Sequence, residues 1–304
     1  MANKHSVYQT ILLTVFLLCD STAVLAESSE EKITLPGSEK SYTEKEINNF
    51  FEVPDWYPEK HIPMPTVVSH GAKPKVFACA SCHLTSGSGH PESSALAGLP
   101  VEYQIRQMKA YQKFQRNSVI GVMNTIARAM TNEQIRDSAE YFAALPALDV
   151  QEVREAIDVP LTYVNKRFML LELESGSDKK EKIGERIIML PVDENRVKAR
   201  DPYATFITYV PEGSLLTGKK LVNEGKGNAA ACTSCHGADL KGTSVAPLIA
   251  GQHASYLRAQ LRDYKAGIRR GEADPGKIMA TNMKYFTDWE ILATAAYIAS
   301  LPRQ

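Results

Sequence analysis

A five-residue pattern, Cys-x-x-Cys-His, constrains this chain more than any other feature and occurs twice, at residues 79–83 and 232–236. With five cysteines and seven histidines in 304 residues, two chance occurrences are negligible. A four-cysteine zinc site keeps its pairs about 15–20 residues apart, whereas these pairs lie 153 residues apart. A thioredoxin-like redox pair needs a βαβ setting that the flanks lack. Disulfides alone leave the histidine after each pair without a role.

The pattern is the attachment motif for haem c. Two thiols one helical turn apart add to the two vinyl groups of one haem, and the adjacent histidine then coordinates the iron. We therefore expect two covalently bound haem c groups. The expected attachment cysteines and axial histidines are Cys79, Cys82 and His83 in the first motif and Cys232, Cys235 and His236 in the second.

The two motifs belong to an internal duplication. A shift of 153 residues aligns the motifs and also pairs Tyr103 with Tyr256, Gln107 with Gln260 and Tyr111 with Tyr264. A shift of 156 residues aligns the ends, including Leu145-Pro146 with Leu301-Pro302. Extra residues around 274–276 account for the change of shift. Each copy is therefore expected to carry one haem.

Each copy is predicted to be helical. Residues 101–115 and 254–267 place apolar side chains three and four positions apart, which puts them on one helical face. A closing helix in each copy begins at a capping box and ends before a proline. These closing helices are bounded by Thr131 and Pro146 and by Thr287 and Pro302.

Residues 148–211 have no counterpart in the duplicated copy. They contain three runs rich in β-branched, aromatic or large apolar residues, which predict strands. The runs are Arg167 to Leu173, Arg186 to Val192 and Ala204 to Val210, and Ser175 to Lys180 is expected to be an exposed turn. We expect a small β-containing insertion that either braces the two haem domains or serves as a docking platform for a partner dehydrogenase.

The first 26 residues are typical of a secretory signal peptide. Lys4 lies in a short polar region, an apolar run from Ile11 to Leu18 follows, and Ala26 precedes the expected cleavage site. The apolar run is too short to span about 30 Å of hydrocarbon. Without a twin arginine, the Sec route is expected. The location expected for the mature chain is the periplasm.

The expected organisation has five parts: a signal peptide (1–26), an N-terminal leader (27–64), a first haem domain (65–147), the β-containing insertion (148–211) and a second haem domain (212–304). The leader is polar, and one short helix is expected near Thr43 to Phe51.

The sequence resembles the di-haem class I cytochromes c, particularly the cytochrome c-four group. The resemblance covers about residues 65–147 and 212–304. Besides the two motifs, it rests on Leu96 to Pro100 with its partner Ile249 to His253, and on the endings Tyr141 to Pro146 and Tyr297 to Pro302. It implies a mainly α fold: two tandem class I cytochrome c domains with the small β-containing insertion between them.

The resemblance also implies a methionine as the second axial ligand, downstream of each motif and before the last helix. Met123 matches that position in the first copy, where Met130 is expected to pack in the core. Met279 and Met283 are both candidates in the second copy. The shift of 156 maps Met123 onto Met279, so Met279 is the expected ligand and Met283 the alternative. A second histidine ligand at either haem is a less favoured option.

Charge and ligand type limit the function. Thirty-five basic residues balance thirty-five acidic ones, so the basic excess typical of a nucleic-acid binder is absent. Methionine ligation makes an electron-transfer site. We expect a non-enzymatic carrier of single electrons between a respiratory or substrate-oxidising donor and an oxidase or other acceptor. The alternatives are a dedicated cytochrome subunit of a dehydrogenase complex and, less favoured, a di-haem peroxidase.

The expected partners are redox proteins: a dehydrogenase, an oxidase or another cytochrome. Peripheral association with a membrane complex is a further option. Four arginines of the second copy stand out: Arg258, Arg262, Arg269 and Arg270. Arg258 and Arg262 lie one helical turn apart and are first interpreted as a solvated face; the alternatives are partners of the haem propionates or part of a docking patch.

Overall fold

The computed structural model describes residues 31–164, 170–173, 178–270 and 275–304. The signal-peptide prediction (1–26) and the first half of the predicted turn at 175–180 (residues 175–177) lie outside these ranges. Within them, no helix combines the length and the apolar character that crossing a bilayer requires.

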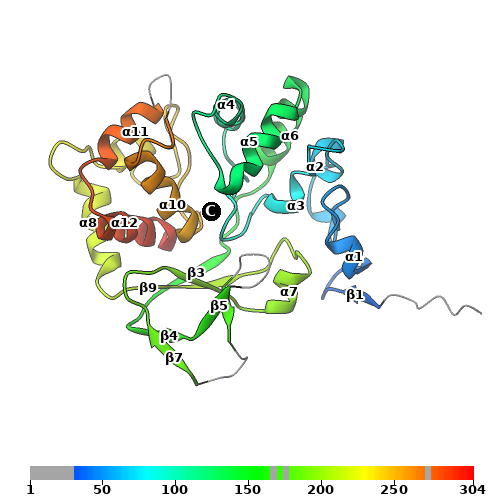
Figure 1. Ribbon diagram of the computed structural model, residues 1–304, viewed down its shortest axis with the longest axis horizontal. Helices are drawn as coiled ribbons and strands as arrows, with labels where there is room; N and C mark the ends of the chain where they lie inside the picture. The colour runs from blue at the N-terminus through cyan, green and yellow to red at the C-terminus, as the bar shows by residue number, and fades with distance from the viewer. Residues whose placement is uncertain (1–30, 165–169, 174–177, 271–274) are drawn as a thin grey trace, which may run out of the picture. The chain divides into compact units, whose positions relative to one another are not determined.

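The first repeat (residues 65–147) is helical, as predicted (Figure 1). Its helices are α2 (Thr66–Ser69), α3 (Ala80–His83), α4 (Val101–Gln112), η2 (Val119–Gly121), α5 (Val122–Ala129) and α6 (Asn132–Ala144). Helix α4 packs against both α5 and α6. It ends three residues before the predicted end because Phe114 takes a left-handed conformation, φ 55°, which a continuing α-helix excludes.

The second repeat (residues 212–304) has the same closing arrangement and one longer helix at its start. Its helices are α8 (Ser214–Glu224), α9 (Thr233–His236), α10 (Ala254–Lys265), α11 (Pro275–Met283) and α12 (Asp288–Ser300). Helix α12 packs on α8 and α10 (Figure 1). Both predicted capping boxes are confirmed, at Thr131 with Gln134 and at Thr287 with Glu290.

Helices α8 and α12 approach each other most closely at Gly218. A β-carbon added there would lie 2.0 Å from the carbonyl oxygen of Ala293 and 2.7 Å from the β-carbon of Tyr297. No side chain fits in that space, because both neighbours are backbone or the base of a side chain. The crossing of the two helices therefore requires glycine at position 218, although glycine has a low helix propensity.

We expect Gly218→Ala to lower the free energy of unfolding by about 3 kcal/mol, because the two helices must move apart to admit a methyl group. Urea titration of the haem-loaded protein measures the change. Lys219→Ala, at an exposed position on the same helix, is the matched control and should leave the midpoint in place. Equal midpoints for the two variants would contradict the tight crossing.

The first repeat has no helix of this length at its start among the described residues, only the single turn α2. The leader packs there instead, because Val53 and Met64 contact the core of the first repeat. The leader contains β1 (Lys32–Thr34) paired antiparallel with β2 (Ser41–Thr43), then α1 (Glu44–Ile47) and η1 (Pro58–Lys60). The predicted leader helix is confirmed as one turn, capped by Thr43.

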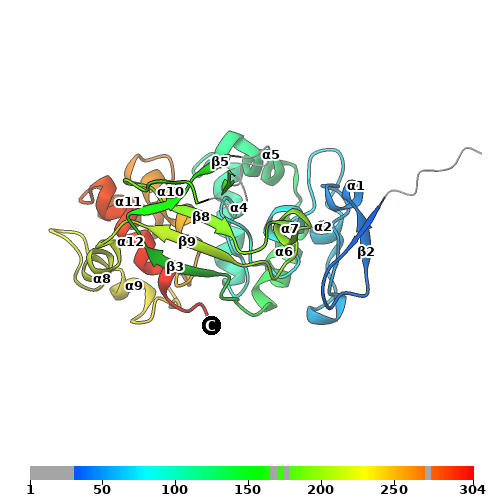
Figure 2. The same ribbon diagram turned by 90° about the horizontal axis from the view of Figure 1, so that it is seen from below.

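The described residues of 148–211 form three small sheets and one short helix. Strands β3 (Gln151–Glu155), β9 (Phe206–Val210) and β8 (Ile188–Pro191) lie side by side in that order, β3 parallel and β8 antiparallel to β9 (Figure 2). The remaining elements are β4 (Asp158–Pro160) with β7 (Lys180–Lys182), β5 (Thr162–Val164) with β6 (Leu170–Glu172), and α7 (Glu194–Lys198). The predicted runs contain β6, β8 and β9, whereas the other strands are short and were not predicted.

The segment 148–211 shares an apolar core with the second repeat. Met189 and Phe206 of the segment are buried in one cluster with Leu257 and Ile291 of the second repeat, and Leu99 of the first repeat joins them. The cluster therefore combines residues from all three stretches of the chain.

Candidate functional site

The first Cys-x-x-Cys-His motif forms one helical turn. Cys79 is the residue before α3, and Cys82 and His83 lie within it. Both thiols are free of disulfide bonds. The Nδ1–H of His83 donates to the carbonyl oxygen of Ser94 at 2.8 Å, which leaves Nε2 with its lone pair. Burial lowers the pKa of His83 to about 4, so the ring is neutral, as an iron ligand must be.

The second motif has the same geometry. Cys232 precedes α9, and His236 ends it. The Nδ1–H of His236 donates to the carbonyl oxygen of Pro247 at 2.8 Å, and burial lowers the pKa of His236. Pro247 is the residue onto which the 153-residue shift maps Ser94. The hydrogen bond that orients the imidazole is thus repeated, and it is the kind of contact that sets the tautomer of a metal-bound histidine.

The candidate methionines differ in burial. Met123 on α5 and Met279 on α11 are both partly buried against the core of their own repeat. Met283 is only 2% exposed and belongs to the core. Met130 is likewise a core residue, as predicted. Positions 123 and 279 therefore match in burial as well as in sequence.

The remaining histidines of the described ranges have hydrogen-bond partners of their own. His253 is fully buried, and its Nε2–H donates to the carbonyl oxygen of Ser88 at 2.9 Å. His61 contacts Asp55 at 2.9 Å, and His90 contacts Glu92 at 2.8 Å. The exposed His70 contacts Ser69.

Two buried arginines link the repeats. Arg116 and Arg269, which the 153-residue shift superposes, are 5% and 7% exposed. Arg116 donates to Gln260 at 2.8 Å and to the Tyr256 hydroxyl at 2.6 Å, both in the second repeat. Arg269 makes the reciprocal contacts in the first repeat, donating to Gln107 at 2.8 Å and to the Tyr103 hydroxyl at 3.1 Å. Each arginine therefore hydrogen-bonds to the other repeat.

This arginine pair is open to an anionic group. Within the described ranges, neither guanidinium is ion-paired with a carboxylate, and Nε of Arg116 is buried without a hydrogen-bond partner. Two uncompensated buried cations cost several kcal/mol. Haem c carries propionate carboxylates, so the donor set at Arg116 and Arg269 fits that cofactor.

Arg269 is buried, so it is not part of a solvated face. Arg262 does lie on an exposed face, 3.9 Å from Asp288. Arg116 was missed by the sequence reasoning, although the 153-residue shift that aligns the motifs also maps it onto Arg269.

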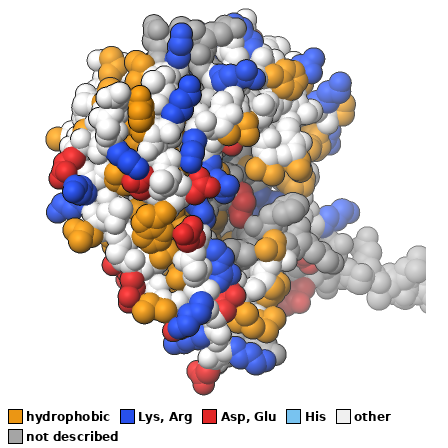
Figure 3. Space-filling view, turned by 60° about the vertical axis from the view of Figure 1, so that its left-hand side comes forward, with side chains coloured by type: hydrophobic (Ala, Val, Ile, Leu, Met, Phe, Trp, Pro, Cys, Tyr) orange, Lys and Arg blue, Asp and Glu red, His pale blue; other side chains and the backbone are white. Residues whose placement is uncertain are grey.

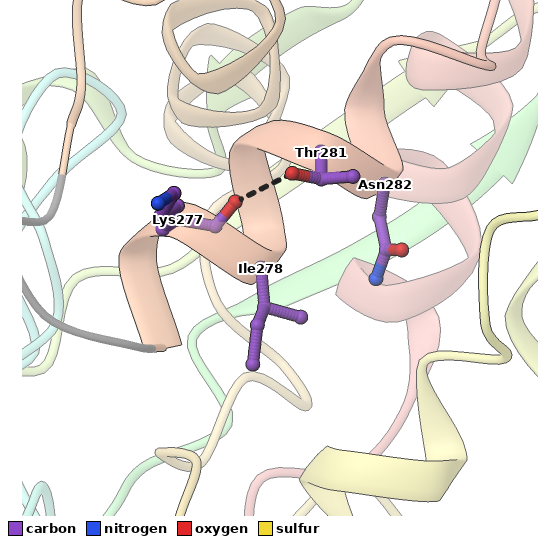
Figure 4. A pocket seen from close by; sticks show the side chains of 4 residues that line it. All are labelled: Lys277, Ile278, Thr281 and Asn282. Atoms are coloured by element: carbon purple, nitrogen blue, oxygen red, sulfur yellow. Dashed lines mark hydrogen bonds between the residues drawn. The ribbon is translucent and has the colours of Figure 1, made fainter.

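A shallow depression of about 280 Å³ lies along α11 and is lined by Lys277, Ile278, Thr281 and Asn282. Figure 4 shows the Thr281 hydroxyl turned back to the Lys277 carbonyl, at 3.0 Å, while Ile278 and Asn282 project from the same helix. The lining of this depression contains neither a cysteine nor a histidine, so the depression is separate from the two Cys-x-x-Cys-His motifs.

Comparison with known proteins points to one family. The family profile described as Cytochrome c matches residues 217–302. The thiosulfate dehydrogenase electron acceptor of Stutzerimonas stutzeri is 25% identical over 234 residues, 76% of this chain and 82% of that protein. Cytochrome c4 of Azotobacter vinelandii is 40% identical over 83 residues, 25% of this chain and 39% of that protein.

A shorter relative is matched over most of its length. The cytochrome subunit of sulfide dehydrogenase of Chlorobaculum tepidum is 32% identical over 87 residues, 28% of this chain and 74% of that protein.

One solved structure has a similar fold. Thiosulfate dehydrogenase from Marichromatium purpuratum matches with a TM-score of 0.53 at 24% identity. The match covers 78% of this chain but only 39% of that chain. It supports the fold and nothing beyond it.

Proposed function

Since this chain belongs to the cytochrome c family, as a di-haem class I member similar to cytochrome c4 with covalently bound haem c, we propose that it carries single electrons in the periplasm. The donor is a respiratory or substrate-oxidising enzyme, and the acceptor is an oxidase or another cytochrome. Haem c supplies reversible one-electron exchange at its iron. The observation that carries the proposal is the repeated Nδ1–H contact of His83 and His236 with a backbone carbonyl.

The proposed roles follow the duplicated motifs. Cysteines at 79 and 82, and at 232 and 235, would hold haem c through thioether bonds. His83 and His236 would offer Nε2 to the iron, and Met123 and Met279 would offer a thioether sulfur. Arg116 and Arg269 balance propionate charge. We propose the organisation expected from the sequence: signal peptide 1–26, leader 27–64, haem domains 65–147 and 212–304, and insertion 148–211.

The choice of Met279 over Met283 is supported by burial. Met283 corresponds to Ala127, and both side chains lie in the core. Met279 corresponds to Met123, and both are partly exposed. A side chain that faces a cofactor keeps some exposure when only protein atoms surround it, whereas a core side chain does not.

For the insertion 148–211 we propose a bracing role. The hydroxyls of Ser86 and Ser88, just after the first motif, both donate to the carbonyl oxygen of Pro202, at 2.8 and 3.1 Å. The indole N–H of Trp56 donates to the carbonyl oxygen of Ala199 at 2.9 Å. With the core that the segment shares with the second repeat, these contacts support a fixed mutual placement of the two haem domains.

A second candidate function is a dedicated subunit of a dehydrogenase complex. It is favoured by the names of two relatives, a thiosulfate dehydrogenase electron acceptor and a sulfide dehydrogenase cytochrome subunit. The electron chemistry is the same in both cases, and only the permanence of the partner differs. The donor that we propose in this case is an enzyme that oxidises a reduced sulfur compound.

The proposal is tested by optical redox titration of the natively purified protein. We expect two reversible one-electron reductions per chain and an intact mass that exceeds the processed chain by two haems. A haem that binds peroxide and turns it over would contradict a pure carrier. Size measurement on the same sample separates the two candidates, because co-purification with a large catalytic chain rejects the free carrier.

A further inference from the structure

An exposed apolar loop lies between α4 and α5 of the first repeat. Val119 is 85% exposed, Ile120 is 84% exposed, and Phe114 is 49% exposed. We call residues 114–120 the 114–120 loop. Single exposed apolar residues are ordinary, but three large ones within seven positions form a patch of the kind that marks an interaction surface.

The loop is held in this arrangement. Ile120 has φ 49°, a left-handed conformation that a β-branched residue rarely takes and that persists only when the surroundings impose it. Asn124, 4% exposed, holds the preceding residues 111–118 in place. Its side-chain amide donates to the carbonyl oxygens of Tyr111 and Arg116, both at 2.9 Å, and accepts from Ser118 N at 3.1 Å. The apolar side chains are therefore presented outward by a preorganised loop.

The charged residues in this stretch of sequence have one sign. Residues 103–132, flanked by Glu102 and Glu133, contain no aspartate or glutamate and five cations, of which Arg116 is buried. Arg106 and Arg128 are exposed, and the Arg128 guanidinium lies 5.3 Å from the centre of the Phe114 ring. The second repeat differs, since residues 256–288 include four carboxylates. Figure 3 shows basic, acidic and apolar side chains interspersed over the face that carries α8, α11 and α12.

We propose that the 114–120 loop is the docking surface for a redox partner protein whose contact area has an apolar centre and an acidic rim. The apolar side chains fit the centre, and Arg128, which lies beside the Phe114 ring, complements the rim. The backbone N–H of Met123 donates to the Ser118 hydroxyl at 2.8 Å, so a docked partner lies next to the proposed axial ligand of the first haem. The inference rests on the proposed electron-transfer function, and it makes the first repeat the side of electron exchange.

The test uses a surface of defined chemistry in place of the unidentified partner. Gold electrodes coated with a mixed monolayer of carboxylate- and methyl-terminated alkanethiols present an acidic, apolar contact area. We expect the haem-loaded wild-type protein to adsorb in electroactive form, and Val119→Ser with Ile120→Ser to reduce that coverage by about tenfold. Leu216→Ser, which removes a 77% exposed side chain on α8, is the matched control and should adsorb like wild type.

Three results bear on the proposal. Wild-type coverage that falls with added salt supports the acidic rim, because screening weakens exposed charge pairs. Unchanged coverage for the loop variant overturns docking through the loop. Binding to phosphatidylglycerol vesicles that is lost in the loop variant also overturns it, in favour of a lipid surface. Solution redox titration of each variant separates the claims, since a wild-type protein without reversible reduction refutes the electron-transfer function itself.

Discussion

Replacing Cys232 and Cys235 by alanine together is expected to leave one covalently attached haem per chain instead of two. Each motif forms its own helical turn and orients its own histidine, through Ser94 in the first repeat and through Pro247 in the second. Removing the second pair of thiols therefore leaves the chemistry of the first pair in place. Intact mass spectrometry and the absorbance of the extracted haem measure the stoichiometry.

The control for this experiment is Ser234→Ala, which changes a residue between the same cysteines and keeps both thiols. It should retain two haems. Loss of both haems in the double-cysteine variant would show that attachment in the two repeats is coupled. Retention of both haems would refute the second attachment site.

Met279→Ala is expected to remove the sulfur-to-iron charge-transfer band of one haem and to lower its reduction potential by on the order of 100 mV, because a thioether ligand favours the ferrous state. The other haem should titrate as before. Far-red absorption of the oxidised protein and optical redox titration report the two changes separately.

Met283→Leu is the matched comparison, because it keeps an apolar side chain of similar volume at the buried position one turn away. It should leave both spectrum and potentials in place. If Met283→Leu loses the band and Met279→Ala keeps it, the assignment of Met279 as the iron ligand is wrong. The register of the second repeat relative to the first is then displaced by one turn in this helix.

The parts of the fold that could be predicted depend on neighbours in sequence. A Cys-x-x-Cys-His motif brings both thiols and the histidine together within one turn, so its chemistry is readable without a fold. A capping box joins a residue to the third one after it, as Thr131 does with Gln134 and Thr287 with Glu290. The closing helices α6 and α12, which these capping boxes begin, were confirmed.

The parts that could not be predicted depend on residues far apart in the chain. Strands β3 and β7, Gln-Glu-Val-Arg-Glu and Lys-Glu-Lys, consist mostly of charged and polar residues, so they lack the β-branched and aromatic composition that indicates a strand. Parallel pairing of β3 with β9 becomes possible only when the intervening chain returns.

The arginine pair required the same kind of information. Nothing local distinguishes Arg116 from the other, surface cations of residues 103–132. It is buried because the second repeat supplies Tyr256 and Gln260 as acceptors. The sequence by itself determined which residues are suited to hold the two haems, because covalent attachment and helix capping act over a few positions. Only the tertiary structure decided how the repeats, the leader and residues 148–211 share contacts, because those contacts form only after distant segments of the chain have packed together.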